Sequence, residues 1–341
     1  MRALRLRSEE ELSLEEVDDP PPPAAGQVRL RMRVIALNHI DLWGYRGMAF
    51  VRRRLPIIAG VEGAGAVEAV GAGVEGVAPG MRVVVYPGLF CRTCRACRAG
   101  RENLCENVAG IMGFHLDGLA AELVNVPAHL VLPIPQGVEW RDAACGPVTF
   151  AAVQHMLFDN AQLQAGETIL VHAGGSGVGS TAIRMAKAIG ATVFATVGSE
   201  EKLAKVLALG ADHAINYRTQ RFEGEVRRLT AKRGVDVVFE HIGPDTWSGS
   251  LLSLARGGRL VTCGATSGLS APTNLFHLFQ QQIRIIGSFG ASLRNVREGL
   301  GKMASGTVLP VIDSEIGLAE FGRGIDRLAS RAVFGKVIVH I

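Results

Sequence analysis

The chain has 341 residues, of which 48% are apolar and 20% charged, with 42 glycines and a net charge of +4. This composition supplies a packed core and excludes a disordered chain, and the length suits two or three domains. The sequence has no apolar run long enough for a membrane span, no secretory signal pattern and no basic block typical of nucleic-acid binding. We therefore expect a cytoplasmic protein that acts on a small molecule, with neither a membrane nor a nucleic acid as partner.

The first half of the chain indicates β-structure. Residues 1–20 are predicted to form two strands joined by a turn. Residues 27–37 alternate apolar and polar side chains, as in a half-buried strand. From Gly60 to Gly88, short valine-rich runs are separated by glycines, with no helical period. These patterns predict a compact, β-barrel-like domain.

After residue 150, strand patterns alternate with helix patterns. Apolar strands are predicted at 167–173, 192–197, 213–217, 235–243 and 258–264. Segments with helical spacing separate them, for example 180–191 and 200–211. Alternation at this spacing is typical of βαβ units on a parallel sheet. The second half is therefore predicted to be α/β.

A glycine-rich turn follows the first of these strands. Small residues there would let the backbone approach a pyrophosphate, which would sit at the positive end of the following helix. The alternative is a strand–helix turn that binds nothing. The residues that we assign to this dinucleotide site are Gly174, Ser176, Gly177, Val178 and Gly179.

The end of the second strand favours NADPH over NADH. Sites selective for NADH carry an acid there, whereas this strand ends at Val197, Gly198 and Ser199. The residues predicted to surround a 2′-phosphate are Ser199, Lys202, Tyr217 and Arg218. The alternative is that the two basic residues among them are ordinary surface charges.

Four of the six cysteines are clustered at Cys91, Cys94, Cys97 and Cys105. Four thiolates in one loop match the ligand set of a closed, structural zinc site. Free thiols or disulfides are the alternatives. A fully coordinated zinc leaves no open position for a substrate, so we expect this metal to stabilise a lobe and to take no part in chemistry.

These motifs resemble the medium-chain dehydrogenase/reductase superfamily, which includes zinc-type alcohol dehydrogenases and quinone oxidoreductases. The matching segments are LNHIDLWGYRG (37–47), GVEGAGAVEAVG (60–71), PGMRVVVYPG (79–88), the cysteine loop (91–105), HAGGSGVGSTAIRMAKAIGA (172–191) and FGKVIVHI (334–341). The resemblance implies an α/β protein with a GroES-like β-barrel domain (1–149 and 291–341, with a zinc lobe at 88–108). It also implies a Rossmann domain with a doubly wound parallel sheet (150–290), oxidoreductase activity, and a homodimer or homotetramer.

The resemblance also indicates that a second, catalytic zinc is lost. The three ligand positions of the zinc-dependent members correspond here to Asn38, Val61 and a position near Val148, and the hydroxyl that relays the alcohol proton corresponds to Ile40. Glu62 survives beside them, and we interpret it as a relic that pairs with an arginine, with an acid of the substrate cleft as the alternative. Without a metal, oxidation of an alcohol loses several kcal/mol of stabilisation, whereas an activated acceptor needs less help.

The candidate catalytic residues are Asn38, Tyr45 and Asp41. Asn38 and Tyr45 would orient or protonate a substrate carbonyl, with turn formation and packing as the alternatives, and Asp41 has structural support as its alternative. By resemblance, Gly264 and Ser288 approach the nicotinamide. A basic run, Arg52–Arg54, is interpreted as solvated surface charge, with attraction of an anionic substrate as the alternative.

The resulting prediction is an NADPH-dependent oxidoreductase with one structural zinc. It would transfer hydride to a quinone or an α,β-unsaturated carbonyl without a catalytic metal. One alternative is a zinc-type alcohol dehydrogenase whose catalytic site the sequence does not reveal. The other is a protein that binds NADPH without turnover.

Overall fold

The computed structural model describes residues 1–48 and 53–341, and it divides into two compact units. Unit 1 contains residues 1–151 and 291–341, and unit 2 contains residues 152–290. None of the helices in these described ranges is long and apolar enough to cross a membrane. Arg52 of the basic run lies outside the described residues.

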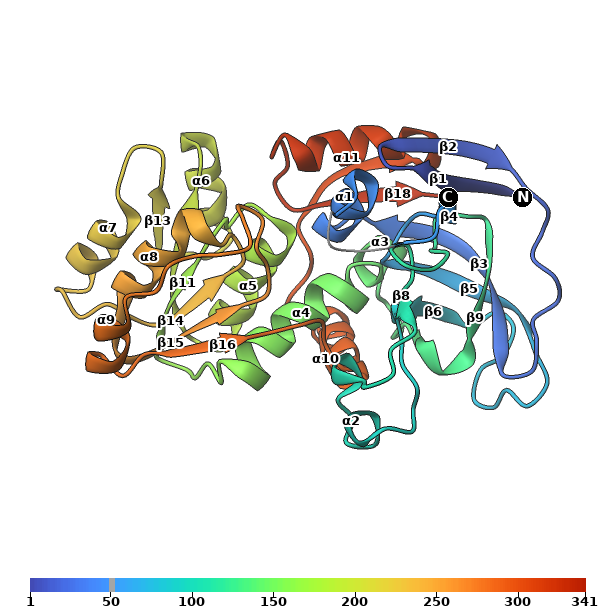
Figure 1. The fold of residues 1–341 in the computed structure, drawn as a ribbon, viewed down its shortest axis with the longest axis horizontal. Helices are drawn as coiled ribbons and strands as arrows, with labels where there is room; N and C mark the ends of the chain where they lie inside the picture. The colour runs from blue at the N-terminus through green and yellow to red at the C-terminus, as the bar shows by residue number, and fades with distance from the viewer. Residues whose placement is uncertain (49–52) are drawn as a thin grey trace. The chain divides into compact units, whose positions relative to one another are not determined.

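Unit 1 is built on β-sheets (Figure 1). A small sheet has the order β2-β1-β4, and the main sheet has the order β10-β6-β5-β3-β18-β17, with β9 also paired to β3. Their bounds are β1 (Arg2–Ser8), β2 (Glu11–Glu16), β3 (Gln27–Ala36), β4 (Ile57–Ile58), β5 (Gly63–Val70), β6 (Arg82–Val85), β9 (Leu123–Pro127), β10 (Val131–Pro133), β17 (Ile312–Gly317) and β18 (Lys336–His340).

The end of the chain completes this sheet. Strand β18 pairs antiparallel with β3 and parallel with β17, so residues from the two ends of the sequence become neighbours. Strands β3, β5, β6 and β18 form the core of the unit, and their buried positions are apolar apart from Lys336 at the start of β18. The helical segments of unit 1 are α1 (His39–Arg46), α2 (Arg95–Arg98), η1 (Glu102–Leu104), η2 (Ala128–Leu130), α3 (Trp140–Ala143), η3 (Gly146–Phe150), α10 (Leu293–Ala304), η5 (Leu318–Glu320) and α11 (Phe321–Ala329).

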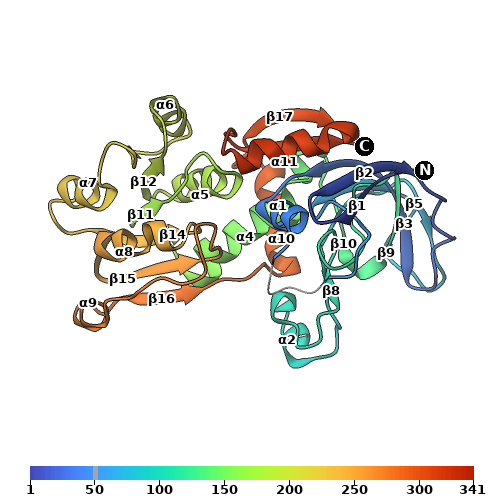
Figure 2. The same cartoon turned by 45° about the horizontal axis from the view of Figure 1, so that its top comes forward.

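A separate lobe of unit 1 carries α2 and η1. It is joined to the rest through the short pair β7 (Gly88–Leu89) and β8 (Gly110–Ile111). Figure 2 shows α2 on a loop that projects from the sheets of this unit. No residue of α2 is buried. The lobe therefore lacks an apolar core of its own and needs another source of order.

Unit 2 is a parallel six-stranded sheet of order β13-β12-β11-β14-β15-β16. Its strands are β11 (Thr168–Val171), β12 (Thr192–Val197), β13 (His213–Asn216), β14 (Val235–Glu240), β15 (Leu254–Thr262) and β16 (Arg284–Gly287). Its helical segments are η4 (His155–Asn160), α5 (Gly177–Ala188), α6 (Glu200–Ala208), α7 (Phe222–Leu229), α8 (Pro244–Ser253) and α9 (Leu275–Gln280), and α4 (Ala151–Gln154) lies at the boundary of the two units.

This strand order is that of a doubly wound Rossmann fold, and it confirms the predicted fold class. Because helices cover such a sheet, its inner strands are mostly apolar, as in the buried residues of β11 and β12, where Thr196 is the exception. The order reverses between β11 and β14. Dinucleotides bind at the carboxyl ends of the strands at such a point.

Candidate functional site

A buried group of four polar side chains lies in unit 1. The Lys336 ammonium donates to Oδ1 of Asn38 (2.7 Å), to Oε2 of Glu62 (3.0 Å) and to Oγ1 of Thr149 (2.8 Å). Lys336 is 3% exposed, and Glu62 and Thr149 are fully buried. All three ammonium hydrogens therefore have acceptors, which is the condition under which a buried charge is tolerated. We call these four residues the lysine cluster.

Four separate segments supply the lysine cluster. Asn38 precedes α1, Glu62 precedes β5, Thr149 lies in η3, and Lys336 begins β18. The Glu62 carboxylate links three of them, because Oε1 accepts from the backbone N–H groups of Val148 (2.6 Å) and Thr149 (2.9 Å), and Oε2 accepts from Nδ2 of Asn38 (2.8 Å). The cluster thus joins three neighbouring strands of the main sheet, β5, β3 and β18, to η3.

The lysine cluster occupies the region that the resemblance assigns to a catalytic metal. Positions 38, 61 and 148 gather around Glu62, which supports the proposed correspondence of the lost ligands. The partner of Glu62 is Lys336 and not an arginine, so that interpretation was wrong. The sequence carried one signal for it: a lone lysine in the mostly apolar segment FGKVIVHI.

The Asn38 amide is fully used inside the protein. Its Nδ2 donates to the carbonyl of Ala36 (3.0 Å) and to Glu62, and its Oδ1 accepts from Lys336 and from Oγ1 of Thr149 (3.0 Å). An amide nitrogen has two hydrogens, and both are taken. Asn38 therefore has no hydrogen left for a substrate carbonyl in this arrangement.

Asp41 fixes the start of α1. Its carboxylate accepts from the backbone N–H groups of Asn38 (2.8 Å) and Val61 (3.1 Å). Burial raises the pKa of Asp41 to about 7, against the opposing effects of these hydrogen bonds and of Lys336. Tyr45 lies one turn further along α1, half-buried, and lines a small pocket together with Asp41, Gly44 and Gly60.

The two described arginines of the basic run, Arg53 and Arg54, differ in their surroundings, and only one of them fits the interpretation as solvated surface charge. Arg54 is exposed, but the Arg53 guanidinium lies over the ring of Phe114, 5.1 Å from its centre. Burial lowers the pKa of Arg53. Arg53 is thus a packed side chain and not a solvated charge.

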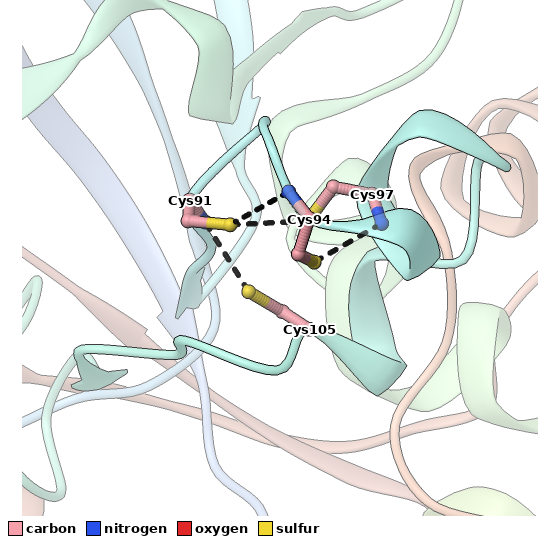
Figure 3. A group of neighbouring side chains, drawn as sticks. All are labelled: Cys91, Cys94, Cys97 and Cys105. Carbon is pink, nitrogen blue, oxygen red and sulfur yellow. Dashed lines mark hydrogen bonds between the residues drawn. The ribbon is translucent and has the colours of Figure 1, made fainter.

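The four clustered cysteines come together in the lobe of unit 1. Their sulfur atoms lie within 4.8 Å of one another, and Figure 3 shows them facing a common centre. The Cys91 and Cys97 sulfurs are 4.0 Å apart, close to the spacing expected around a zinc ion with Zn–S bonds of about 2.3 Å.

The backbone is also arranged for thiolates in this lobe. Backbone N–H groups point at the sulfurs of Cys91, Cys94 and Cys105. The Thr93 hydroxyl, with backbone N–H groups, lowers the pKa of Cys91 to about 5. Cys91, Cys94, Cys97 and Cys105 would therefore hold the zinc, which would order a lobe that has no core.

In unit 2, the glycine turn connects β11 to α5 with little room for side chains. A Cβ on Gly179 would lie 2.3 Å from the Ala173 carbonyl oxygen, so only glycine fits there. Ser176 caps α5, accepting from the N–H of Gly179 at 2.9 Å. Gly177 and Val178 form the first turn of the helix, where N–H groups lack helical partners. The turn is therefore suited to bind a pyrophosphate.

The end of β12 carries the residues predicted to select the cofactor. Ser199 caps α6, which places Lys202 in the first turn of that helix. Tyr217 packs against Gly198, where a Cβ would lie 2.5 Å from its hydroxyl. The first acidic residue after β12, Glu200, accepts a hydrogen bond from Asn216. Ser199, Lys202 and Tyr217 therefore gather near the tip of β12, and Arg218 follows Tyr217.

The two residues expected near the nicotinamide lie at the carboxyl ends of neighbouring strands. Gly264 follows β15, where a Cβ would be 2.9 Å from the His241 carbonyl oxygen. Ser288 follows β16, and its hydroxyl accepts from Nδ2 of Asn160 at 2.9 Å. Both therefore lie at the strand ends where a dinucleotide binds.

Two family comparisons match this chain. Residues 24–136 match the alcohol dehydrogenase GroES-like domain, and residues 177–305 match the zinc-binding dehydrogenase family. A solved NAD-dependent alcohol dehydrogenase superposes with a TM-score of 0.95, with 39% identity and full coverage of both chains. The chain belongs to the medium-chain dehydrogenase/reductase superfamily.

Relatives in this superfamily are oxidoreductases, and so is this chain. An acryloyl-coenzyme A reductase of Metallosphaera sedula is 33% identical over 95% of each chain. A quinone oxidoreductase of Pseudomonas aeruginosa is 30% identical over 94% of this chain and 93% of its own. Membership of the superfamily and the cysteine geometry together indicate a structural zinc and a nicotinamide cofactor.

Proposed function

We propose that this chain is an NADPH-dependent reductase of α,β-unsaturated carbonyl compounds or quinones that works without a catalytic metal. The observation that carries the proposal is the Lys336 ammonium at the place of a catalytic metal ion. A fixed positive charge bound to Glu62 and Asn38 repels a second cation. Among the described residues, the only group of three or more close metal ligands is the cysteine cluster.

The chemistry fits such acceptors. The cofactor supplies the hydride, which adds to an electron-poor carbon, and a proton must then reach the product. Tyr45, half-buried on α1, is our candidate for a hydrogen bond to the substrate carbonyl. Asn38 acts as a positioning residue, because its amide connects the start of α1 to Glu62. The relatives named for acryloyl-coenzyme A and quinone agree with this choice of acceptor.

The test measures the oxidation of NADPH with a panel of acceptors, in the presence and in the absence of a chelator. We expect oxidation of NADPH by enones, an acryloyl thioester or quinones, unchanged by brief treatment with a chelator that leaves the structural zinc in place. Tyr45→Phe should lower kcat by about tenfold or more. Faster turnover of alcohols, lost on chelation, would instead indicate an alcohol dehydrogenase. Cofactor binding without turnover on any acceptor would indicate a binding protein.

We further propose that NADPH is preferred, through Ser199, Lys202, Tyr217 and Arg218. Lys202→Ala should raise KM for NADPH about tenfold and leave KM for NADH unchanged, since a charged hydrogen bond to phosphate contributes about 1.5–3 kcal/mol. Lys205→Ala is the matched control, because Lys205 lies on the same helix and pairs with Glu201. An equal response to both cofactors would contradict the assignment.

We also propose that the chain forms a homodimer or homotetramer through β16. This edge strand pairs with β15 alone among the described strands, and Ile285 on it is 38% exposed. The neighbouring apolar side chains are also exposed, namely Leu275, Phe276, Phe279 and Phe289. Strands of a parallel sheet are normally covered, so an exposed apolar edge favours pairing with a second copy.

A further inference from the structure

A buried acid lies at the point of unit 2 where the strand order reverses. Glu240 is the last residue of β14 and is fully buried, next to the end of β11. The glycine turn leaves β11 and is suited to the pyrophosphate. In a doubly wound sheet the two halves of a dinucleotide lie on either side of this point. The adenosine half is assigned to the β12 side, so the nicotinamide half belongs to the side of β14.

The hydrogen bonds of Glu240 suit an ionised carboxyl group. Oε1 accepts from the backbone N–H groups of Ile242 (2.6 Å) and Gly243 (3.1 Å), and Oε2 accepts from the hydroxyls of Ser250 (2.7 Å) and Thr246 (2.8 Å). Four donors suit a carboxylate.

The one ion-pair partner of Glu240 among the described residues is His172, and that ring is neutral. Its Nε2 lies 2.8 Å from Oγ of Ser250 and 3.7 Å from the carboxylate. Because the Ser250 hydroxyl gives its hydrogen to Glu240, Nε2 must carry the proton, and Nδ1 accepts from Thr196 (3.1 Å). Burial also lowers the pKa of His172.

The other titratable groups beside Glu240 add no charge at neutral pH. The His241 ring lies 2.9 Å from the His172 carbonyl oxygen through Nε2, and burial lowers its pKa. Burial raises the pKa of Cys263 to about 12, so this side chain is a thiol. The negative charge of Glu240 is therefore compensated by dipoles and by no cation.

We propose that Glu240 is a fixed negative charge that favours the oxidised nicotinamide over the reduced one and thereby makes the bound cofactor a stronger hydride donor. When reduced nicotinamide gives a hydride, two electrons and a proton leave together for the acceptor carbon, and the ring becomes a cation. A buried carboxylate nearby stabilises that cation, because charges interact strongly in a medium of low dielectric constant.

Hydrogen bonding alone does not require a charge at this position. A glutamine amide could accept from Ile242 and Gly243 through its oxygen and donate to the hydroxyls of Thr246 and Ser250 through its nitrogen. A buried carboxylate costs more to desolvate than such an amide. Because a glutamine would meet the same hydrogen bonds at a lower cost, the negative charge of Glu240 is the property that the proposal explains. The inference rests on the nicotinamide cofactor and is independent of the substrate proposed above.

The test is the ratio of the dissociation constants of oxidised and reduced cofactor, measured by fluorescence titration without substrate. Glu240→Gln should weaken binding of the oxidised form about tenfold relative to the reduced form. That ratio corresponds to about 30 mV for a two-electron couple. Glu240→Asp keeps the charge and Asp245→Asn removes an exposed one nearby, so both should retain the wild-type ratio. An equal change in both affinities for Glu240→Gln would overturn the proposal.

A measurement on the unaltered protein applies even if Glu240→Gln does not fold. A dinucleotide with a neutral benzamide ring in place of the pyridinium has nearly the same shape as the oxidised cofactor and lacks its charge. We expect it to bind about tenfold more weakly than the oxidised cofactor. Equal affinity for the two would show that Glu240 exerts no useful field at the ring and would overturn the proposal.

Discussion

At the scale of single residues, both units of the protein bury charged side chains. Lys336 and Glu62 compensate one another inside unit 1, whereas Glu240 in unit 2 is held by N–H and hydroxyl donors. Both arrangements cost desolvation energy that apolar side chains would not. Such groups are expected at a functional site.

Replacing Lys336 tests the lysine cluster. Lys336→Met should lower the free energy of unfolding by about 3–5 kcal/mol, because it leaves Glu62 buried without a cation. Lys205→Met removes an exposed lysine and should change stability by less than about 0.5 kcal/mol. Urea unfolding of both variants measures the difference. The double variant Lys336→Met/Glu62→Gln should recover part of the loss, and no recovery would mean that the pair is not coupled.

Asp41 should make stability depend on pH. Its pKa is about 7 in the folded protein and near 3.8 in the unfolded chain, so between these values the folded state binds more protons. Its contribution therefore favours folding at low pH and is lost as pH rises from about 4 to 7. Relative to Asp41→Asn, the wild type should lose stability across this window, on the order of 4 kcal/mol at about 1.4 kcal/mol per pKa unit. Unfolding at pH 5, 6, 7 and 8 checks this, and parallel curves would contradict it.

At the scale of elements, local patterns predicted unit 2 well. The apolar run 192–197 is β12 itself, and the glycine turn leads directly into α5. The spacing of apolar residues and the residue types of a turn are local properties, so they can be recognised in the sequence. The π-helical hydrogen bonding of η3 was not predicted, since nothing in GPVTF marks it. Two backbone N–H groups of η3 donate to Glu62, a residue 86 positions away from Val148.

The cysteine lobe should depend on its metal. Cys97→Ser should reduce zinc from about one per chain to near zero and lower Tm by roughly 5 °C, because the lobe has no core to replace the metal. Cys145→Ala is the control, since this buried thiol donates to the Arg141 carbonyl outside the lobe. Elemental mass spectrometry and calorimetry measure both. Zinc retained at full content in Cys97→Ser would exclude Cys97 as a ligand.

The glycine turn should not tolerate a side chain. Gly179→Ala places a Cβ 2.3 Å from the Ala173 carbonyl oxygen, so the turn must shift. We expect the Kd for the dinucleotide to rise about tenfold or more, since helix N–H groups bind phosphate only at close approach. Gly224→Ala on α7 has no close neighbour within 3.9 Å and should leave binding unchanged. Titration with reduced cofactor distinguishes the two, and equal affinities would contradict the assignment.

At the scale of the whole molecule, the site in unit 1 is assembled from distant parts of the chain. Asn38 and Lys336 are 298 positions apart and meet because β18 returns to pair with β3. The resemblance predicted this return and named Asn38 as a candidate site residue, whereas Glu62 was interpreted as a relic. It did not predict Lys336 or Thr149, because partners across such a separation are defined by strand register and not by local pattern.

Strand β16, the exposed edge of the sheet in unit 2, is the proposed interface between copies of the chain. If two copies pair through β16, Ile285→Lys should convert the assembly to a single chain of 36.2 kDa, because a charged residue on an edge strand opposes pairing. Leu14→Lys is the matched control, since Leu14 is also 38% exposed but lies on β2 of unit 1. Light scattering after gel filtration gives the masses. A wild-type mass of one chain, or an Ile285→Lys mass equal to that of the wild type, would exclude β16 as the interface. In that case the apolar side chains along α9 would need another partner.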